Sequence, residues 1–422
     1  MVDRMTSAET ADPDRAVLRG PIGVVPELWS GSGGVYQYSL SILRALEGSP
    51  GLVVFSDAAR NQELERLRRA GVDVRSFTPP RRDPRLLHLA AGATRQVARR
   101  LGISAPTLAR RRPALATWLR ASGVPLVVYP KPMHESFETG VPYVSAIHDL
   151  QHRLQPRFPE VGAPAERRAR EYVMRNVAAH AAVVLADSDV GKEDLLEAYG
   201  RYGLEEERVA VLPFAPPPYL DAPPALDPAP AEGLPPRYLF YPAQFWPHKN
   251  HVALVRALGV LRREHGLDPS LVLVGSHTGP LRRRTFEEVM AAAREEGVED
   301  RLHYLGLVPD DAMARLYADA DALVMPTFFG PTNIPILEAW ALGVPVVTSD
   351  LRGIREQVGD AGLLADPSSP EALADAVRRV LTDEALRARL TLRGRERHES
   401  YTANDFRERL LRILDEALAR VD

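Results

Sequence analysis

Short apolar runs alternate with amphipathic stretches along most of this chain. Apolar runs between turn residues are typical of strands buried on both faces, and the stretches between them have helical periodicity. This alternation predicts parallel sheets with helices on both faces, so the predicted fold class is α/β. The strands are expected within residues 21–28, 52–57, 72–77, 125–130, 143–149, 182–188, 208–214, 238–243, 270–275, 302–307, 322–327 and 344–350.

A proline-dense stretch interrupts this alternation, and the same pattern restarts after it. Such a segment can neither continue a helix nor lie inside a sheet, so we predict a linker at residues 219–236. It separates a first domain at 18–218 from a second at 237–402, and both are expected to be doubly wound, Rossmann-like sheets. Residues 1–17 lack the apolar stretch of a signal peptide and are expected to form a disordered tail.

Helix boundaries can be predicted at two further places. Ser188 is expected to cap a helix that ends at Gly200. Residues 403–422 have the pattern of an amphipathic helix, which must pack on another element through its apolar face. That face consists of Phe406, Leu410, Ile413, Leu414, Ala417, Leu418 and Val421.

Composition narrows the classes of function. The chain has 422 residues and a net charge of −3, and no apolar run approaches the roughly 18 residues of a membrane span. Neither nucleic-acid binding nor an integral membrane protein is therefore expected. The chain has no cysteine, which excludes disulfides and thiolate metal sites and fits a cytoplasmic location. Because no other metal-ligand cluster stands in the sequence, no metal is expected.

Lysine is rare in this chain. Of 53 basic residues, only Lys131, Lys192 and Lys249 are lysine. A compact ammonium suits a point contact to phosphate, whereas arginine favours a bidentate partner. These three positions are therefore candidates for special contacts, although chance placement remains an alternative.

Two open sheets that face each other leave a cleft, and ligands of such sheets bind beyond the carboxyl ends of the strands. One candidate site follows the strand at 322–327. A short helix is expected there, capped by Thr332 or Asn333. The N–H groups of Asn333, Ile334 and Ile336 could donate to a phosphate at its N-terminus.

Glu338 lies about one turn inside this helix. Its carboxylate would repel a phosphate, so a neutral diol such as that of a ribose is the partner we expect if Glu338 meets the ligand. The alternative is that Glu338 only complements the helix dipole.

A second candidate site is the loop at residues 243–251, which places Lys249 beside another helix N-terminus. Asn250 is the expected cap of that helix. Lysine and free N–H groups together suit a diphosphate, and we expect Lys249 to lie in an exposed loop. Trp246 and His248 are expected to form walls of the pocket.

Two further candidates lie in the first domain. Gly33 and Gly34 precede a helix and would let the backbone approach a ligand closely. The dinucleotide fingerprint is incomplete there, so nicotinamide and flavin cofactors are not expected. His148 lies at a strand end facing the cleft, where it could bind a substrate hydroxyl or serve as a buried structural histidine.

Several of these segments resemble glycosyltransferase family 4, which has the GT-B fold. The similarity extends over nearly everything from Pro21 to Tyr401. The motifs that carry it are "GSGGVYQYSL", "AIHDLQHRLQP", "ADSDVGKEDLL", "PAQFWPHKN", "LHYLGLVPDDAMARLYADADALVMPT", "FGPTNIPILEAWALGVPVV" and "SDLRGIREQVGDAGLLADP".

The resemblance implies two Rossmann-like domains facing across a cleft and a retaining, metal-independent transfer of a hexose-type sugar. The donor would be a nucleotide diphosphate sugar bound by the second domain. The acceptor, a glycan, a lipid-linked molecule or a small molecule, would bind the first domain. The closing helix would return to the first domain.

The resemblance also assigns roles to individual positions. Glu338 matches the glutamate that binds ribose hydroxyls, Lys249 the diphosphate lysine and His148 the active-site histidine beside the donor sugar. The remaining donor-binding positions are Gly33, Gly34, Gln244, Asn250, Val308, Gly330, Thr332, Asn333 and Ile334. Among them, Val308 matches backbone near the base.

Two positions depart from the family pattern. The family's first glutamate falls at Gly330, and the arginine that accompanies the lysine falls at Gln244. Arg352 or Lys131 could supply the missing charge. The departures suggest one alternative, a protein that binds a nucleotide sugar without transferring it. A nucleotide-sugar epimerase is a second alternative.

One further segment is strongly basic. Residues 81–120 contain ten arginines and one acid, Asp83. This composition fits a solvated face, or a peripheral contact with anionic lipid at the inner face of the membrane.

Overall fold

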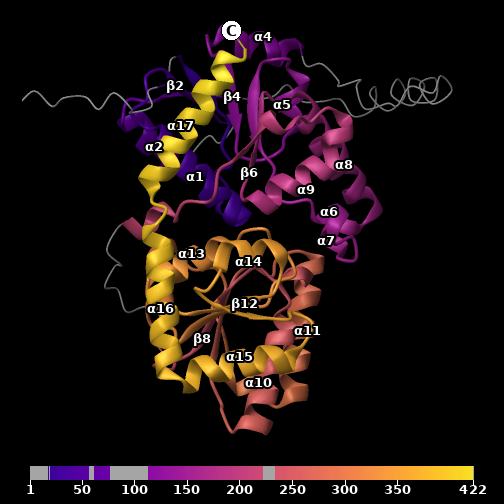
Figure 1. The fold of residues 1–422 in the computed structure, drawn as a ribbon, viewed down its shortest axis with the longest axis vertical. Helices are drawn as coiled ribbons and strands as arrows, with labels where there is room; N and C mark the ends of the chain where they lie inside the picture. The colour runs from indigo at the N-terminus through magenta and orange to yellow at the C-terminus, as the bar shows by residue number, and fades with distance from the viewer. Residues whose placement is uncertain (1–17, 19, 57–60, 77–112, 222–232, 422) are drawn as a thin grey trace, which may run out of the picture.

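The computed structural model describes residues 18, 20–56, 61–76, 113–221 and 233–421. The predicted tail at 1–17, most of the predicted linker and most of the basic segment at 81–120 lie outside these residues. Figure 1 shows the described chain as two α/β domains, one above the other.

The first domain is built on a fully parallel sheet with the strand order β3-β2-β1-β4-β5-β6-β7. Its strands are β1 (Ile22–Val24), β2 (Leu52–Ser56), β3 (Asp73–Ser76), β4 (Leu126–Tyr129), β5 (Tyr143–Ala146), β6 (Val183–Ala186) and β7 (Val209–Val211). Its helices are α1 (Gly34–Leu46), α2 (Gln62–Arg69), α4 (Pro113–Ala121), α5 (His134–Glu138), α6 (Gln151–Leu154), α7 (Pro159–Gly162), α8 (Pro164–His180) and α9 (Asp189–Tyr199).

The second domain repeats the design, with the parallel strand order β10-β9-β8-β11-β12-β13. Its strands are β8 (Leu239–Pro242), β9 (Leu271–Val274), β10 (Leu302–Tyr304), β11 (Ala322–Met325), β12 (Val346–Ser349) and β13 (Leu363–Ala365). Its helices are α10 (His251–His265), α11 (Pro280–Glu296), α12 (Asp310–Ala318), α13 (Ile334–Ala341), α14 (Arg352–Val358), α15 (Pro370–Thr382) and α16 (Glu384–Glu399).

All the predicted strands are present, and the α/β class is confirmed. The pattern missed β13, a three-residue strand that is only partly buried and carries little hydrophobic signal. The helix α9 begins as expected, because the Ser188 hydroxyl accepts a hydrogen bond from the Gly191 N–H at 3.0 Å.

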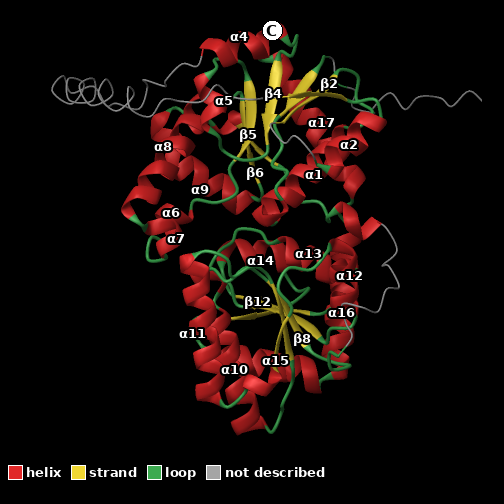
Figure 2. Cartoon of the chain, turned by 180° about the vertical axis from the view of Figure 1, so that it is seen from behind, coloured by secondary structure: helices red, strands yellow, loops and turns green. Residues whose placement is uncertain are grey.

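The last helix, α17 (Ala403–Ala419), leaves the second domain and runs along the first (Figure 1). Phe406, Leu410 and Leu414 are buried in one core with residues of β1 and α1. A capping box at Thr402 and Asp405 starts this helix where the chain leaves α16. The apolar face read from the sequence therefore covers the first domain's sheet, and Figure 2 shows the same arrangement from behind.

In each sheet the strand order reverses at one place, between β1 and β4 in the first domain and between β8 and β11 in the second. Loops that follow strands on the two sides of such a reversal splay apart and form a crevice for ligands. The loops that carry the predicted site residues follow β1, β5, β8, β10 and β11.

Candidate functional site

The loops after β1, β8 and β11 meet between the two domains. The side-chain amide of Gln244 donates from Nε2 to the carbonyl oxygen of Gly31 at 2.8 Å. A Cβ atom placed on Gly34 would lie 3.5 Å from the Ile334 side chain. The structure thus brings the glycine turn of the first domain against two predicted donor loops of the second.

Gly33 needs to be glycine for a conformational reason. It stands at the N-terminus of α1 with φ 58° and ψ −121°, a region that L-residues with a Cβ rarely occupy. This conformation turns the chain from the 3₁₀ turn at Ser30–Ser32 into α1.

Lys249 lies in a 3₁₀ turn, Pro247–Lys249, rather than in the exposed loop that we expected, and it is half-buried. Its carbonyl oxygen accepts a hydrogen bond from the Tyr241 hydroxyl at 2.8 Å, which fixes the backbone. Within the described part of the chain, its ammonium has no hydrogen-bonded or ion-paired partner. Burial lowers the pKa of Lys249 to about 8.

Asn250 occupies the predicted cap position but does not cap the helix with its side chain. Its backbone is left-handed, with φ 59°, and Nδ2 donates to the carbonyls of Pro326 (3.0 Å) and Pro367 (2.7 Å). The amide therefore ties the Lys249 loop to the loop after β11, which is a structural role in place of the predicted capping one.

The N-terminus of α13 offers fewer free donors than we expected. The Asn333 N–H donates to Gln357 Oε1 at 2.9 Å, and the Ile336 N–H donates to the Asn333 carbonyl at 3.3 Å. The side chain of Asn333 donates to Phe329 and caps nothing. Of the three predicted donors, the Ile334 N–H alone has no partner among the described residues.

Two other predicted positions belong to the second domain. Thr332 is half-buried immediately before α13. Val308 follows β10 and packs, half-buried, against the core of the second domain.

Glu338 is 7% exposed, and both of its carboxylate oxygens are hydrogen-bonded. The Tyr219 hydroxyl donates to Oε1 at 2.8 Å, and the Tyr317 hydroxyl donates to Oε2 at 2.6 Å. Burial raises the pKa of Glu338, and the two hydroxyls partly offset this effect. The carboxylate thus accepts from neutral hydroxyls, the kind of partner that we expected for it, but in this structure the hydroxyls belong to tyrosines that sequence reasoning missed.

His148 lies at the end of β5 with both ring nitrogens engaged. Nε2 donates to the Pro130 carbonyl at 2.7 Å, and Nδ1 lies 2.9 Å from Asp187 Oδ1. Burial alone would lower the pKa of His148, but the negative charge of Asp187 and the two acceptors outweigh burial and raise it. The structure therefore favours the structural alternative, because neither nitrogen is left for a substrate hydroxyl.

A cavity of about 180 Å³ lies between the domains, and both domains line it. His148 and Asp149 line it from the first domain, and Gly330 and Arg352 line it from the second. The Gly330 carbonyl accepts from Gln151 Nε2 at 2.9 Å across the seam.

A second cavity of about 330 Å³ lies in the first domain and shares His148 and Asp149 with the first. Lys131 and Arg170 also line it, but both are ion-paired, Lys131 with Glu27 and Arg170 with Asp149 at 2.7 Å. The two cavities are therefore neighbours on either side of the segment that follows β5.

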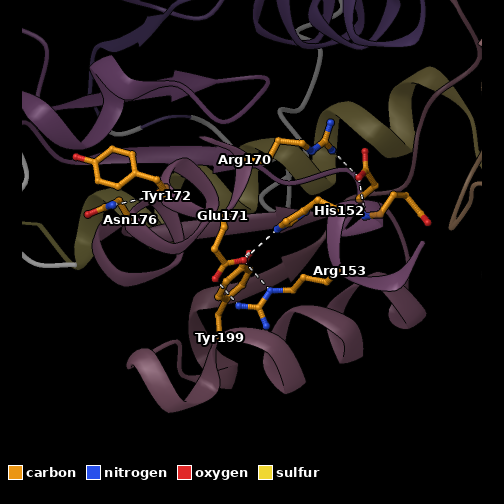
Figure 3. A network of polar contacts seen from close by, with 9 residues as sticks. His152, Arg153, Arg170, Glu171, Tyr172, Asn176 and Tyr199 are labelled. Carbon is orange, nitrogen blue, oxygen red and sulfur yellow. Dashed lines mark hydrogen bonds and ion pairs between the residues drawn. The ribbon is translucent and has the colours of Figure 1, made fainter. Parts of the chain in front are cut away.

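That segment is anchored by a polar network on α8 (Figure 3). Glu171, next to Arg170, accepts from His152 Nε2 at 3.0 Å and from Arg153 Nε at 2.8 Å. Tyr199, at the end of α9, adds a longer hydrogen bond of 3.4 Å. These contacts fix α6, and with it the position of Asp149.

The two residues that could supply the missing charge are both ion-paired with acids of the protein. Arg352 binds Glu193 (2.7 Å) and Asp194 (3.0 Å) on α9, and Lys131 binds Glu27. The cation that does contact Gln244 is Arg282, whose Nη1 donates to Gln244 Oε1 at 2.5 Å. Sequence reasoning missed it because it stands 38 residues further along the chain.

The described residues contain no group of three or more His, Cys, Asp and Glu side chains that could hold a metal ion. None of the helices that they form is long and apolar enough to cross a membrane.

Comparison with known proteins gives a partial family match and a shared fold. Residues 226–397 match the family described as "Glycosyl transferases group 1". The chain is 37% identical over 158 residues to O-antigen chain mannosyltransferase B of Escherichia coli, across 37% of this chain and 40% of that protein. It is 31% identical over 300 residues to a D-inositol 3-phosphate glycosyltransferase of Salinispora tropica, across 66% of this chain and 60% of that protein.

The matched segments thus span about half the length of these curated relatives. A crystal structure of Anabaena Alr3699/HepE in complex with UDP and glucose superimposes with a TM-score of 0.68 at 18% identity, over 94% of this chain and 99% of that one. The predicted GT-B fold is therefore confirmed.

Proposed function

We propose that this protein is a retaining glycosyltransferase that moves a hexose-type sugar from a nucleotide diphosphate to an acceptor hydroxyl. The observation that carries the proposal is Lys249. It is a half-buried ammonium with no acid partner in the described chain, held where three switch-point loops meet. Burying an uncompensated charge is costly, so a site of this kind fits an anion that arrives with the substrate.

The leaving diphosphate is the anion that best fits this site. When the bond between sugar and phosphate breaks, negative charge grows on the phosphate oxygens. The Lys249 ammonium and the Ile334 N–H would then stabilise the transition state more than the ground state. The glycine turn at Gly33 and Gly34 allows backbone to approach the same phosphates.

Glu338 would bind the ribose of the donor. Its environment in the structure already consists of hydroxyl donors, so a ribose hydroxyl can replace the Tyr219 hydroxyl without a change in the kind of interaction. Tyr317 is fully buried beneath the carboxylate and would hold its other oxygen throughout.

A retaining reaction without an enzyme nucleophile agrees with the state of the nearby acids. Asp149 is bound by Arg170, and Asp187 by His148. A carboxylate engaged in this way is a poor nucleophile. We therefore propose attack by the acceptor on the face that the leaving group vacates, with no metal ion, and a positioning role for the His148 and Asp187 pair.

The acceptor would enter through the cavity of the first domain, which adjoins the interdomain cavity at His148 and Asp149. The mannosyltransferase relative is named for O-antigen chains, and the Anabaena structure holds UDP and glucose. By analogy we propose a glycan, polysaccharide or glycolipid pathway for this chain.

The test is turnover of nucleotide sugars by wild-type protein and by Lys249→Ala. Loss of one cation at the leaving group should reduce the rate at least about a hundredfold. The melting temperature should not fall, because the ammonium has no hydrogen-bond or ion-pair partner within the described protein. Activity within a few-fold of wild type would contradict the role of Lys249, and a change of the donor's sugar without an acceptor would favour an epimerase.

A further inference from the structure

Arg282 is a cation that the structure holds in a defined position. It stands in the first turn of α11 and is half-buried. Its Nη1 donates to Gln244 Oε1 at 2.5 Å, and its guanidinium lies 4.8 Å from the centre of the Trp246 ring. Both contacts orient the side chain, and neither neutralises its charge.

No carboxylate within the described residues pairs with Arg282, although a neighbouring arginine on the same helix is ion-paired with an acid. Arg284, two positions later, binds Glu288 at 3.0 Å. An arginine that is fixed by an amide and an indole yet lacks an anion presents a free fork of N–H donors. Such a fork matches the geometry of phosphate oxygens.

The position of Arg282 points to the same ligand as Lys249. Gln244 accepts from Arg282 with one end of its amide and donates to the Gly31 carbonyl with the other. A Cβ atom on Gly33 would lie 3.7 Å from the same amide nitrogen. Arg282 is therefore separated from the glycine turn by one amide side chain, and Lys249 stands on the loop that carries Gln244.

The identity of residue 244 explains why the charge comes from α11. A glutamine amide can accept from a guanidinium and donate to a carbonyl at the same time, whereas an arginine is only a donor. An arginine at 244 would lose the contact with Arg282 and place two positive charges side by side. Glutamine at 244 and arginine at 282 are thus chemically linked.

We propose that Arg282 binds the diphosphate group of the donor together with Lys249, so that α11 supplies the second cation of the site. This inference rests on the proposed function for the identity of the donor. The chemistry that it requires of the ligand is a diphosphate group, whatever base and sugar are attached.

The first experiment measures binding of inorganic diphosphate and of UDP, GDP and ADP by calorimetry. Arg282→Ala should weaken both inorganic diphosphate and the preferred nucleotide by about tenfold, the usual size for a charged hydrogen bond. The free nucleoside should bind unchanged. Arg283→Ala is the matched control, because Arg283 is exposed on the adjacent position of the same helix and should leave every affinity unchanged.

The outcomes separate this inference from the proposed function. If wild-type protein binds a nucleoside diphosphate and Arg282→Ala binds it equally well, the role of Arg282 is wrong and the proposed function stands. If inorganic diphosphate binds in an Arg282-dependent manner but no nucleotide binds, the role of Arg282 stands and the proposed function is wrong. Absence of binding by every probe would overturn both.

A second experiment moves the guanidinium from residue 282 to residue 244. Gln244→Arg in the Arg282→Ala background should recover most of the lost diphosphate affinity, because the guanidinium returns to the same place from the loop. Gln244→Arg alone should bind more weakly than this double variant, since two guanidinium groups then compete for one position. Equal loss in the single and double variants, with unchanged melting temperatures, would contradict the exchange.

Discussion

A substitution at Glu338 can distinguish its role in nucleotide binding from its role in the stability of the fold. Glu338→Gln keeps a side chain that can exchange hydrogen bonds with Tyr219 and Tyr317, but it removes the negative charge. We expect affinity for the preferred nucleoside diphosphate to fall by roughly 1.5–3 kcal/mol, typical of a charged hydrogen bond. Calorimetry measures this loss. An unchanged affinity would mean that the carboxylate serves only the two tyrosines.

A structural control for Glu338 is available in Tyr317→Phe. This change removes a donor from a buried carboxylate and should lower the stability of the fold by about 1–3 kcal/mol. Because Tyr317 lies beneath the carboxylate, nucleotide affinity should change less than in Glu338→Gln. Thermal denaturation and calorimetry on both variants distinguish the two effects.

The pKa of Lys249 predicts how the affinity for inorganic diphosphate depends on pH. Its pKa is lowered to about 8 in the free protein, so the ammonium is fully present below that value and is lost as pH rises through it. Affinity for inorganic diphosphate should therefore decline between about pH 7 and about pH 9.5. Lys249→Arg, which stays charged, should lack this decline. A parallel decline in both proteins would assign the titration to another group.

The absence of a side chain at Gly330 predicts which donor sugars the protein accepts. A Cβ atom there would lie 3.5 Å from Ile354, an ordinary contact, so a Cβ fits at this edge of the interdomain cavity. Wild-type protein should accept deoxy sugars, because no carboxylate at this position is left unpaired when a hydroxyl is missing. Gly330→Glu should narrow the donor range or block binding.

The control for this prediction is Gly330→Gln, which adds similar bulk without charge. A panel of matched hydroxyl and deoxy donors, assayed on all three proteins, measures the discrimination. If wild-type protein rejects every deoxy donor and both substitutions leave the pattern unchanged, another group holds the sugar hydroxyl.

Between the 3₁₀ turn and α10, Asn250 joins two elements through its backbone and its amide. Asn250→Gly keeps the left-handed backbone but loses the hydrogen bonds to Pro326 and Pro367, while Asn250→Ala loses both. Each lost hydrogen bond should cost about 1 kcal/mol, and alanine should cost about 1 kcal/mol more for the strained backbone. Melting temperatures should therefore fall in the order wild type, Gly, Ala. Equal melting temperatures for the Gly and Ala variants would show that the left-handed backbone at residue 250 does not affect stability.

The helix α17 has a comparable role for the first domain. It leaves the second domain and buries its apolar face in the core around β1 and α1. The chain therefore crosses between the domains twice, once near Tyr219 and once at Thr402. Because Tyr219 also binds Glu338, the first crossing is in contact with the proposed nucleotide site.

The two domains are held together by contacts that small changes can break. Glu356 on α14 accepts hydrogen bonds from the Asp189 and Val190 N–H groups at 2.8 and 2.9 Å, at the N-terminus of α9. Arg352 binds two acids of the same helix. Exposed pairs of this kind contribute at most about 1 kcal/mol each, so they can govern domain closure without governing folding.

Arg352→Ala combined with Glu356→Ala should therefore open the molecule. We expect a larger radius of gyration by X-ray scattering, a higher KM for the donor and a nearly unchanged melting temperature. The matched control is Arg355→Ala, because Arg355 lies on the same helix but pairs with Asp350 inside its own domain. If both variants scatter alike, these contacts do not hold the domains closed.

Local pattern was sufficient for the elements and for the strand ends that carry the candidate site. Strand and helix periodicity requires only neighbouring residues, and it predicted all strands except the short, partly buried β13. Turn chemistry then placed Gly33 and Lys249 at the carboxyl ends of strands, where a doubly wound sheet binds ligands. The apolar stripe of α17 likewise predicted that this helix packs on another element, but the stripe alone did not identify the domain on which it packs.

Tertiary structure decided which polar groups at this site are free. The Asn333 N–H is taken by Gln357, both nitrogens of His148 by Pro130 and Asp187, and Glu338 by Tyr219, 119 residues away in the chain. Spacing along the sequence carries no record of such pairings, because a hydrogen bond depends on angstrom-scale placement of groups that only the folded domains bring together. The same placement left Lys249 and Arg282 as cations without an acid partner in the described chain.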